Sequence, residues 1–456
     1  MTNTPISEIR SDRELYGNLV RLAAPIMAAN LLQMLYNLAD AFFLGKISAE
    51  AVAAPSISLN LVMFLVVSGL ALATAGTTLI SQSKGKGDRD RVDFYLGQTT
   101  ILLLVLSVVT SLIGVIFARQ ILGLLQVPRS AFAGTLSYLR IILSGMPLMF
   151  LFFVVQAAMQ GVGDSLTPLK IQALTVALNV ALDPILIFGV GPIPRLEVEG
   201  AAIGTVFSRA IASGLALWIL LRGNRDMKLR PEYLVPDWAA QRRLLGIGVP
   251  LAIGQGVASL GFIVLQGIVN SFGTAVVAAF GVGTRIINLF TMPAIGFSRA
   301  TASLVGQSIG ARRLDTAKTV VKQSIGTVFV FISLAMVLVF FFGSSVTRFF
   351  VNDPEVISYG ATMFKVISLS VIPFAMFMVS NGAFQGGGDT RPVMYLNVGR
   401  LWGIRVPVAA LLAIGLSMGP QGIWFAMLLS NIVTATLGFI ILKQGRWLHK
   451  MDPEKI

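Results

Sequence analysis

The chain of 456 residues is apolar and basic: 55% of its residues are hydrophobic, 12% are charged, and the formal net charge is +14. Soluble domains carry roughly 25% charged residues, so this composition excludes a water-soluble fold. Apolar runs recur from residue 19 to residue 442 with short polar breaks, which leaves no room for a catalytic domain outside the membrane. The lack of cysteine excludes disulfides and thiolate metal sites.

The amino-terminal segment is polar and acidic, with Glu8, Asp12 and Glu14, and does not have the layout of a cleaved signal peptide. After it, apolar runs long enough to cross a bilayer predict an all-α, polytopic membrane protein of twelve transmembrane helices. They are expected near residues 17–44, 52–82, 94–119, 134–160, 167–189, 200–222, 244–272, 276–309, 318–343, 357–384, 392–416 and 421–442.

The basic residues lie mostly between the apolar runs and on one side of them, which predicts that both termini are cytoplasmic. They form no patch interleaved with aromatic residues on one segment, so the lipid bilayer is the expected partner and nucleic acid is not.

The two halves of the sequence resemble each other at an offset of about 225 residues, the signature of an internal repeat. Pro25 aligns with Pro250, and the segment 160–164 aligns with 385–389, both of the form Gln-Gly-x-Gly-Asp. Two pseudo-symmetric lobes of six helices are therefore predicted, at residues 1–222 and 244–456, with a cytoplasmic linker at 223–243. Two six-helix bundles without a cavity between them are the alternative.

Two carboxylates fall inside predicted helices of the first lobe. Asp40 shares one face of the first helix with Gln33, Tyr36 and Asn37, because they are spaced by three, four and seven residues. Asp183 follows Asn179 by four residues in the fifth helix, beside Pro184. Helix rise places both acids in the outer half of the bilayer, at a height comparable with that of Thr205 in the sixth helix.

A charged side chain at bilayer depth costs at least about 2.5–3.5 kcal/mol, so each needs a partner or a purpose. Two carboxylates in one desolvated site take up a proton, or a cation enters between them. The sequence therefore predicts a cation-coupling site of Asp40, Asn179, Asp183 and Thr205. H⁺ and Na⁺ both remain open, with Asp40, Asn179 and Asp183 as the metal ligands if the ion is Na⁺; static polar packing is the alternative.

The second half of the chain has no acid at the positions that align with Asp40 and Asp183. It carries polar residues at depth instead, among them Gln255, Arg400 and Arg405. Gln255 is expected either to line a cavity or to hydrogen-bond between helices. Each arginine is expected either to face a substrate or to snorkel to a nearby interface.

The two Gln-Gly-x-Gly-Asp segments predict tight turns, in which the acid caps the next helix or pairs with Arg391. They do not fit a nucleotide-binding loop, since no Lys-Ser/Thr follows and no strand precedes them.

Together, the twelve helices, Pro25, the segments 36–40 and 179–184 and the paired turns resemble the multidrug and toxic compound extrusion (MATE) transporters. The resemblance covers nearly the whole chain. The set Asp40, Asn179, Asp183 and Thr205 matches the cation-binding network of the DinF-like branch, with Tyr36, Asn37 and Tyr138 nearby. Gln255 stands where the NorM-like branch has an acid, which favours the DinF-like branch.

The resemblance implies a secondary transporter, with no enzymatic activity and no cofactor, that exports cationic and aromatic compounds by alternating access. It implies a monomer in the plasma membrane of a bacterium or archaeon. The residues expected to support the polar site or line the substrate cavity are Gln33, Tyr36, Asn37, Tyr138, Met149, Phe153 and Gln255.

Two other classes of exporter share the topology. A flippase of lipid-linked saccharide precursors needs basic residues in its cavity, and the candidates are Arg140, Arg209, Arg285 and Arg299. A major-facilitator antiporter is suggested by the basic loop from Lys84 to Arg91, but the paired Gln-Gly-x-Gly-Asp turns do not fit that class.

Overall fold

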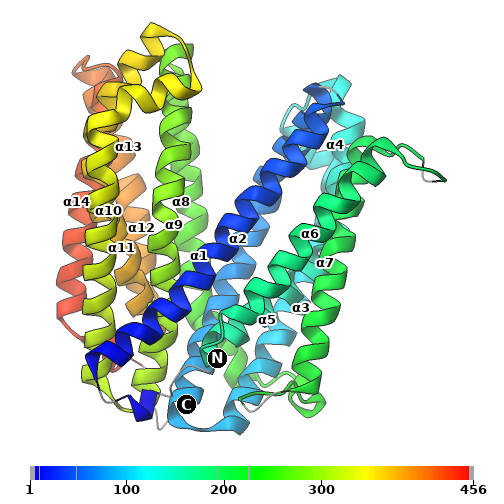
Figure 1. Cartoon of the computed structure of the whole chain (residues 1–456), viewed down its shortest axis with the longest axis vertical. Coiled ribbons are helices and arrows are strands. Elements are labelled where there is room, and N and C mark those ends of the chain that lie inside the picture. Colours follow the sequence, from blue (N-terminus) through cyan, green and yellow to red (C-terminus); the bar gives the residue numbers. More distant parts are fainter. Residues whose placement is uncertain (1–5, 10, 48, 193, 224–225, 451–456) are drawn as a thin grey trace. The chain divides into compact units, whose positions relative to one another are not determined.

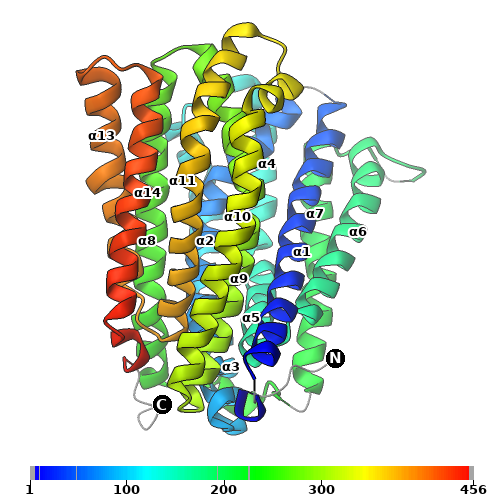
Figure 2. The ribbon, with the colours of Figure 1, turned by 60° about the vertical axis from the view of Figure 1, so that its left-hand side comes forward.

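The computed structural model describes residues 6–9, 11–47, 49–192, 194–223 and 226–450, and within these ranges the chain is helical and contains no β-strand (Figures 1 and 2). Eleven helices are long and apolar enough to cross a membrane, and α4 with α5 makes a twelfth span if the bent pair is counted as one. The predicted all-α fold with twelve spans is confirmed.

The helices of the first half follow the predicted runs. They are α1 (Asp12–Gly45), α2 (Ala49–Lys86), α3 (Arg89–Leu124), α4 (Arg129–Ser144), α5 (Met146–Val162), α6 (Leu166–Phe188) and α7 (Glu197–Arg222). The run expected as one helix at 134–160 is bent by 45° between α4 and α5. Gly145 lies at this break, and Pro147 follows in the first turn of α5, where its missing N–H leaves no helical bond unmade.

The second half repeats this order. Its long helices are α8 (Trp238–Asn270), α9 (Thr274–Gly310), α10 (Leu314–Phe350), α11 (Pro354–Gly386) and α14 (Pro420–Lys443). The run expected at 392–416 is one span of mixed winding: α12 (Arg391–Val398), the π-helical η3 (Gly399–Arg405), α13 (Val406–Ala410) and the π-helical η4 (Leu411–Gly415). Short 3₁₀ turns complete the chain: η1 (Ile6–Glu8), η2 (Pro231–Leu234) and η5 (Arg446–Leu448).

The chain divides into two compact units whose limits fall inside helices. The first unit contains Ala24–Gly248, and the second contains the start of α1 and the chain from Val249 onward. The limits lie one residue before Pro25 in α1 and one residue before Pro250 in α8. Pro25 and Pro250 align in the repeat, so each helix passes from one unit to the other at an equivalent place. The sequence predicted one lobe for each half of the chain. By contacts, the start of α1 belongs to the second unit and the start of α8 belongs to the first.

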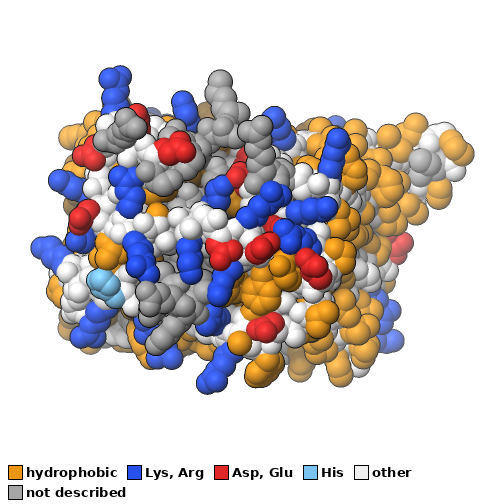
Figure 3. All heavy atoms as spheres, turned by 90° about the horizontal axis from the view of Figure 1, so that it is seen from below, with side chains coloured by type: hydrophobic (Ala, Val, Ile, Leu, Met, Phe, Trp, Pro, Cys, Tyr) orange, Lys and Arg blue, Asp and Glu red, His pale blue; other side chains and the backbone are white. Residues whose placement is uncertain are grey.

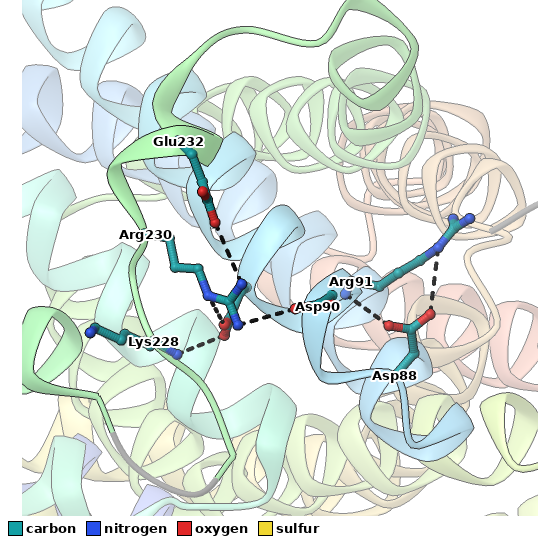
Figure 4. A network of polar contacts seen from close by, with 7 residues as sticks. Asp88, Asp90, Arg91, Lys228, Arg230 and Glu232 are labelled. Carbon is teal, nitrogen blue, oxygen red and sulfur yellow. Dashed lines mark hydrogen bonds and ion pairs between the residues drawn. The ribbon is translucent and has the colours of Figure 1, made fainter.

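The segment between the halves is fixed to the first unit at α3 (Figure 4). Arg230 forms ion pairs with Asp90 at 3.1 Å and with the buried Asp93 at 2.9 Å, and the backbone N–H of Lys228 donates to Asp93. The side chain of Gln98 donates to the carbonyl oxygens of Tyr233 and Val235 at 3.1 and 2.7 Å. This segment therefore packs as part of the first unit.

The two Gln-Gly-x-Gly-Asp turns share a backbone and differ in their side-chain contacts. Gly163 and Gly388 both have positive φ, 92° and 73°, as a tight reversal requires. Asp164 accepts from the backbone N–H of Leu166 and caps α6, as predicted. Asp389 is paired with Lys450 at 3.8 Å instead of with Arg391.

Candidate functional site

The polar residues of α1 in the first unit differ in how far they are buried. Tyr36 is buried and Asp40 is half-buried, whereas Asn37 is exposed and accepts from the side chain of Gln33 at 3.2 Å. Gln33 in turn accepts from Gln172 of α6 at 3.1 Å. The predicted polar face of α1 therefore meets α6 through Gln33.

The polar pair of α6 is enclosed by protein. Asn179 and Asp183 are both fully buried, and the amide of Asn179 donates to Oδ1 of Asp183 at 2.9 Å. Residues four apart face the same way on a helix, so the sequence spacing is sufficient to make this contact.

Helix α7 brings Thr205 to the same place. Its hydroxyl oxygen lies 2.7 Å from the hydroxyl of Tyr36, and both side chains are buried. The neighbouring Gly204 lies directly over α6: a Cβ there would be 2.9 Å from Oδ1 of Asp183. Glycine at this position therefore lets α7 approach the acid, a role that the sequence reading missed.

The carboxyl groups of Asp40 and Asp183 lie within hydrogen-bonding reach of each other. Three oxygen atoms around them are buried without a hydrogen-bond donor among the described residues: Oδ1 of Asp40, Oδ1 of Asn179 and Oδ2 of Asp183. Buried acceptors are almost always satisfied, so this concentration needs an explanation. The four residues predicted as a coupling site are thus neighbours in the first unit.

Two larger side chains border this cluster. The guanidinium of Arg209, one turn after Thr205 on α7, lies 5.9 Å from the centre of the Tyr36 ring. Tyr138 of α4 is buried in an apolar cluster with Leu44 and Ile187. From the sequence, Arg209 is a candidate only as a basic cavity residue of a flippase. Its spacing of four residues from Thr205 predicts that both side chains share one face of α7, beside the polar cluster.

The other expected cavity residues are dispersed. Phe153 is buried on α5, with its ring 5.5 Å from that of Phe150, while Met149 on the same helix is half-buried. Gln255 is exposed on α8 in the second unit. Within the first unit, therefore, the polar cluster and the apolar face of α5 are built from different helices.

The residues present suit a small monovalent cation better than a transition metal. Among the described residues, no group of three or more His, Cys, Asp or Glu side chains comes together. Two carboxyls with amide and hydroxyl oxygens are hard oxygen donors, and they also hold a proton.

A family model of the MatE domain matches the sequence twice, at residues 25–185 and 250–411. The chain belongs to the MatE family. The two matches begin at the aligned prolines Pro25 and Pro250, which confirms the internal repeat.

MatE relatives cover almost the whole chain. The probable multidrug resistance protein NorM of Thermotoga maritima is 30% identical over 95% of this chain and 93% of its own length. The FAD transporter of Shewanella oneidensis is 26% identical over 91% of both. Among solved structures, MATE in the straight conformation matches with a TM-score of 0.90 at 22% identity, covering 99% of this chain and 100% of its own. At that identity the structural likeness shows the fold alone.

Proposed function

We propose that this MatE chain is a secondary active transporter that exports organic compounds, cationic and aromatic drugs among them, in exchange for inward-moving H⁺ or Na⁺. Relatives named for multidrug resistance or multidrug export support the substrate class, including NorM of Thermotoga maritima and MepA of Staphylococcus haemolyticus. In this proposal the compound is moved by alternating access and the cation supplies the driving force.

The observation that carries the proposal is the set of buried acceptors on Asp40, Asn179 and Asp183 without a donor among the described residues. A proton shared by the two carboxyls would supply a hydrogen-bond donor to this group, and a Na⁺ ion would take carboxylate and amide oxygens of this kind as ligands. Either species removes the repulsion between two carboxylates that lie this close in protein. The cluster is therefore chemically suited to loading and releasing one cation.

Cation loading is expected to change how α1, α6 and α7 pack. At this cluster α1 and α7 are joined by the Tyr36–Thr205 hydrogen bond, and α7 lies close to α6 at Gly204, where a Cβ would be 2.9 Å from Oδ1 of Asp183. When the cation leaves, two carboxylates repel each other, and α1 is the helix that changes unit near Pro25. We propose that this repulsion links release of the cation to movement of α1.

The topology is part of the proposal. Figure 3 looks onto the end of the molecule at which α1 begins and α14 ends, and Lys and Arg side chains gather on this face. Cytoplasmic loops retain positive charge, so we assign this end to the cytoplasm of a bacterial or archaeal cell. We further propose that the protein functions as a monomer and belongs to the DinF-like branch, with the coupling acids in the first half alone.

The test is efflux of a cationic dye from proteoliposomes under an imposed pH gradient and, separately, an imposed Na⁺ gradient. We expect one of the two gradients to drive efflux by the wild type, and Asp40→Asn and Asp183→Asn each to abolish it. The matched control is Asp315→Asn, which removes an exposed carboxylate at the start of α10 and should leave efflux unchanged. Efflux at the wild-type rate in both variants would falsify the coupling site.

A further inference from the structure

The second unit buries two arginines on the span that corresponds to α6 of the first unit. Arg400 and Arg405 are 5% and 2% exposed, so neither snorkels to an interface. Both belong to the π-helical segment η3, and winding of this kind occurs often at functional sites.

The repeat makes the comparison between the units specific. The buried face of α6 includes Thr175, Asn179, Asp183 and Ile187, each four residues apart. The corresponding face of the second unit is formed by Arg400, Arg405, Ala409 and Ala413. Arg400 and Arg405 are five residues apart rather than four, and a π-helical turn keeps residues at this spacing on one face. Arginines therefore stand where the first unit has Thr175 and Asn179, and an alanine stands in the place of the acid.

The partners of the two guanidinium groups are neutral. Arg405 donates from Nε to the hydroxyl of Ser430 at 2.9 Å and from Nη2 to Oδ1 of Asn431 at 2.6 Å. Within the part of the chain that the structure describes, Arg400 makes two long hydrogen bonds of 3.5 Å, to the amide oxygens of Asn431 and Asn397. Its Nε is buried without a hydrogen-bond partner among the described residues.

The positive charges are also not neutralised by acids. Among the described residues, no carboxylate forms an ion pair with Arg400 or Arg405. The carboxylates in the helices of the second unit lie at helix starts, as Asp315 in α10 and Glu355 in α11 do. The rings of Phe374 and Phe262 lie 4.7 and 5.7 Å from the guanidinium carbons of Arg400 and Arg405. Such ring contacts offset part of the cost of burying a charge, and no carboxylate in the described part of the chain adds a Coulombic attraction here.

We propose that Arg400 and Arg405 form a binding site for an oxyanion, a carboxylate or phosphate group, within the second unit. Guanidinium groups present a planar fork of N–H donors that matches such groups. Asn431 acts as the positioning residue: its side-chain oxygen accepts from both arginines, and its amide donates to the hydroxyl of Ser370 at 2.9 Å. The anion comes either from solution as a free ion or from the exported compound as its anionic group.

The experiment is thermal unfolding of the purified full chain in detergent, at constant ionic strength, with inorganic phosphate or benzoate added. We expect at least one anion to raise the unfolding midpoint of the wild type by roughly 2–4 °C near saturation. Arg400→Gln should remove the shift, and Arg405→Lys should reduce it because an ammonium lacks the planar fork. The control Arg348→Gln, which removes an exposed charge at the end of α10, should keep the full shift.

The outcomes separate the two sources of the anion. A shift with phosphate indicates a free ion, and a shift with benzoate alone indicates the carboxylate of an organic compound. Equal responses of the wild type, Arg400→Gln and Arg405→Lys, or no response of the wild type to either anion, would overturn the site. Arg400 has only long hydrogen bonds to lose and Arg405→Lys keeps its charge, so at least one variant is expected to fold. The measurement uses no gradient, so its result is independent of the coupling proposal.

Discussion

Gly204 sets how closely α7 approaches the acid of α6, since a Cβ at this position would lie 2.9 Å from Oδ1 of Asp183. Gly204→Ala should therefore push the two helices apart and weaken the Tyr36–Thr205 hydrogen bond. Overpacking of a buried site costs about 1–3 kcal/mol, which exceeds the gain of about 0.5–1 kcal/mol from replacing a helical glycine. We expect a lower unfolding midpoint in detergent and slower dye efflux.

Gly214→Ala is the matched control on the same helix, where a Cβ would meet no atom within 4 Å. It should raise the midpoint slightly and leave efflux unchanged. If Gly204→Ala behaves like Gly214→Ala, α7 does not depend on a close approach at this point.

The hydroxyl pair of Tyr36 and Thr205 links α1 to α7 at 2.7 Å. Tyr36→Phe and Thr205→Val each leave the other buried hydroxyl without its partner, whereas the double variant removes both. We expect the double variant to be less destabilised than the sum of the single variants, by about 0.5–1.5 kcal/mol, in a double-mutant cycle of unfolding free energies. Strict additivity would mean that the two hydroxyls do not interact in the folded protein.

At the scale of the element, Gln98 of α3 makes several of the hydrogen bonds that hold the segment joining the halves. Gln98 is fully buried, donates to two carbonyl oxygens of the segment, and accepts from the N–H of Asp237 at 2.9 Å. Gly97 lets the segment lie close, since a Cβ there would be 2.5 Å from the carbonyl oxygen of Tyr233.

Gln98→Ala should release this segment. The loss of buried hydrogen bonds costs about 1–3 kcal/mol, so the amides of residues 228–241 should exchange hydrogen at least about tenfold faster. Gln323→Ala is the control, because the side chain of Gln323 donates a hydrogen bond of 2.9 Å to the carbonyl of Asp12 in the second unit and, among the described residues, makes no hydrogen bond to residues 228–241. Unchanged exchange in Gln98→Ala would show that the contacts of Lys228 and Arg230 with α3 are sufficient to hold the segment.

Sequence periodicity was enough to predict the helices, the repeat and the facing of Asn179 toward Asp183, because these depend on local spacing. It did not predict the bend at Gly145, where a Cβ would be 2.6 Å from a methyl of Val206 on α7. It also missed the π winding around Arg400 and Arg405, whose side chains hydrogen-bond to Ser430 and Asn431 of α14. The role of Gly204 likewise depends on a contact between helices that spacing along one helix does not contain.

At the scale of the whole molecule, one repeated architecture buries different polar groups in its two units. The first unit concentrates buried carboxyl and amide oxygens on α1 and α6, and the second concentrates buried guanidinium groups on the span from α12 to η4. The family model matches both halves, so the fold is shared while the polar chemistry differs. We infer that the two units bind different ligands, with the coupling cation bound in the first.

The central claim is that the acids of the first unit carry the coupling cation, and it is tested most directly by following that cation. Proteoliposomes loaded with fluorescent indicators of pH and of Na⁺ should report counter-movement of one of these ions when a dye gradient is imposed without any ion gradient. We expect the wild type and Asp315→Asn to give this signal, and Asp40→Asn and Asp183→Asn to give none. Counter-movement of the ion at the wild-type rate in both acid variants would contradict the account.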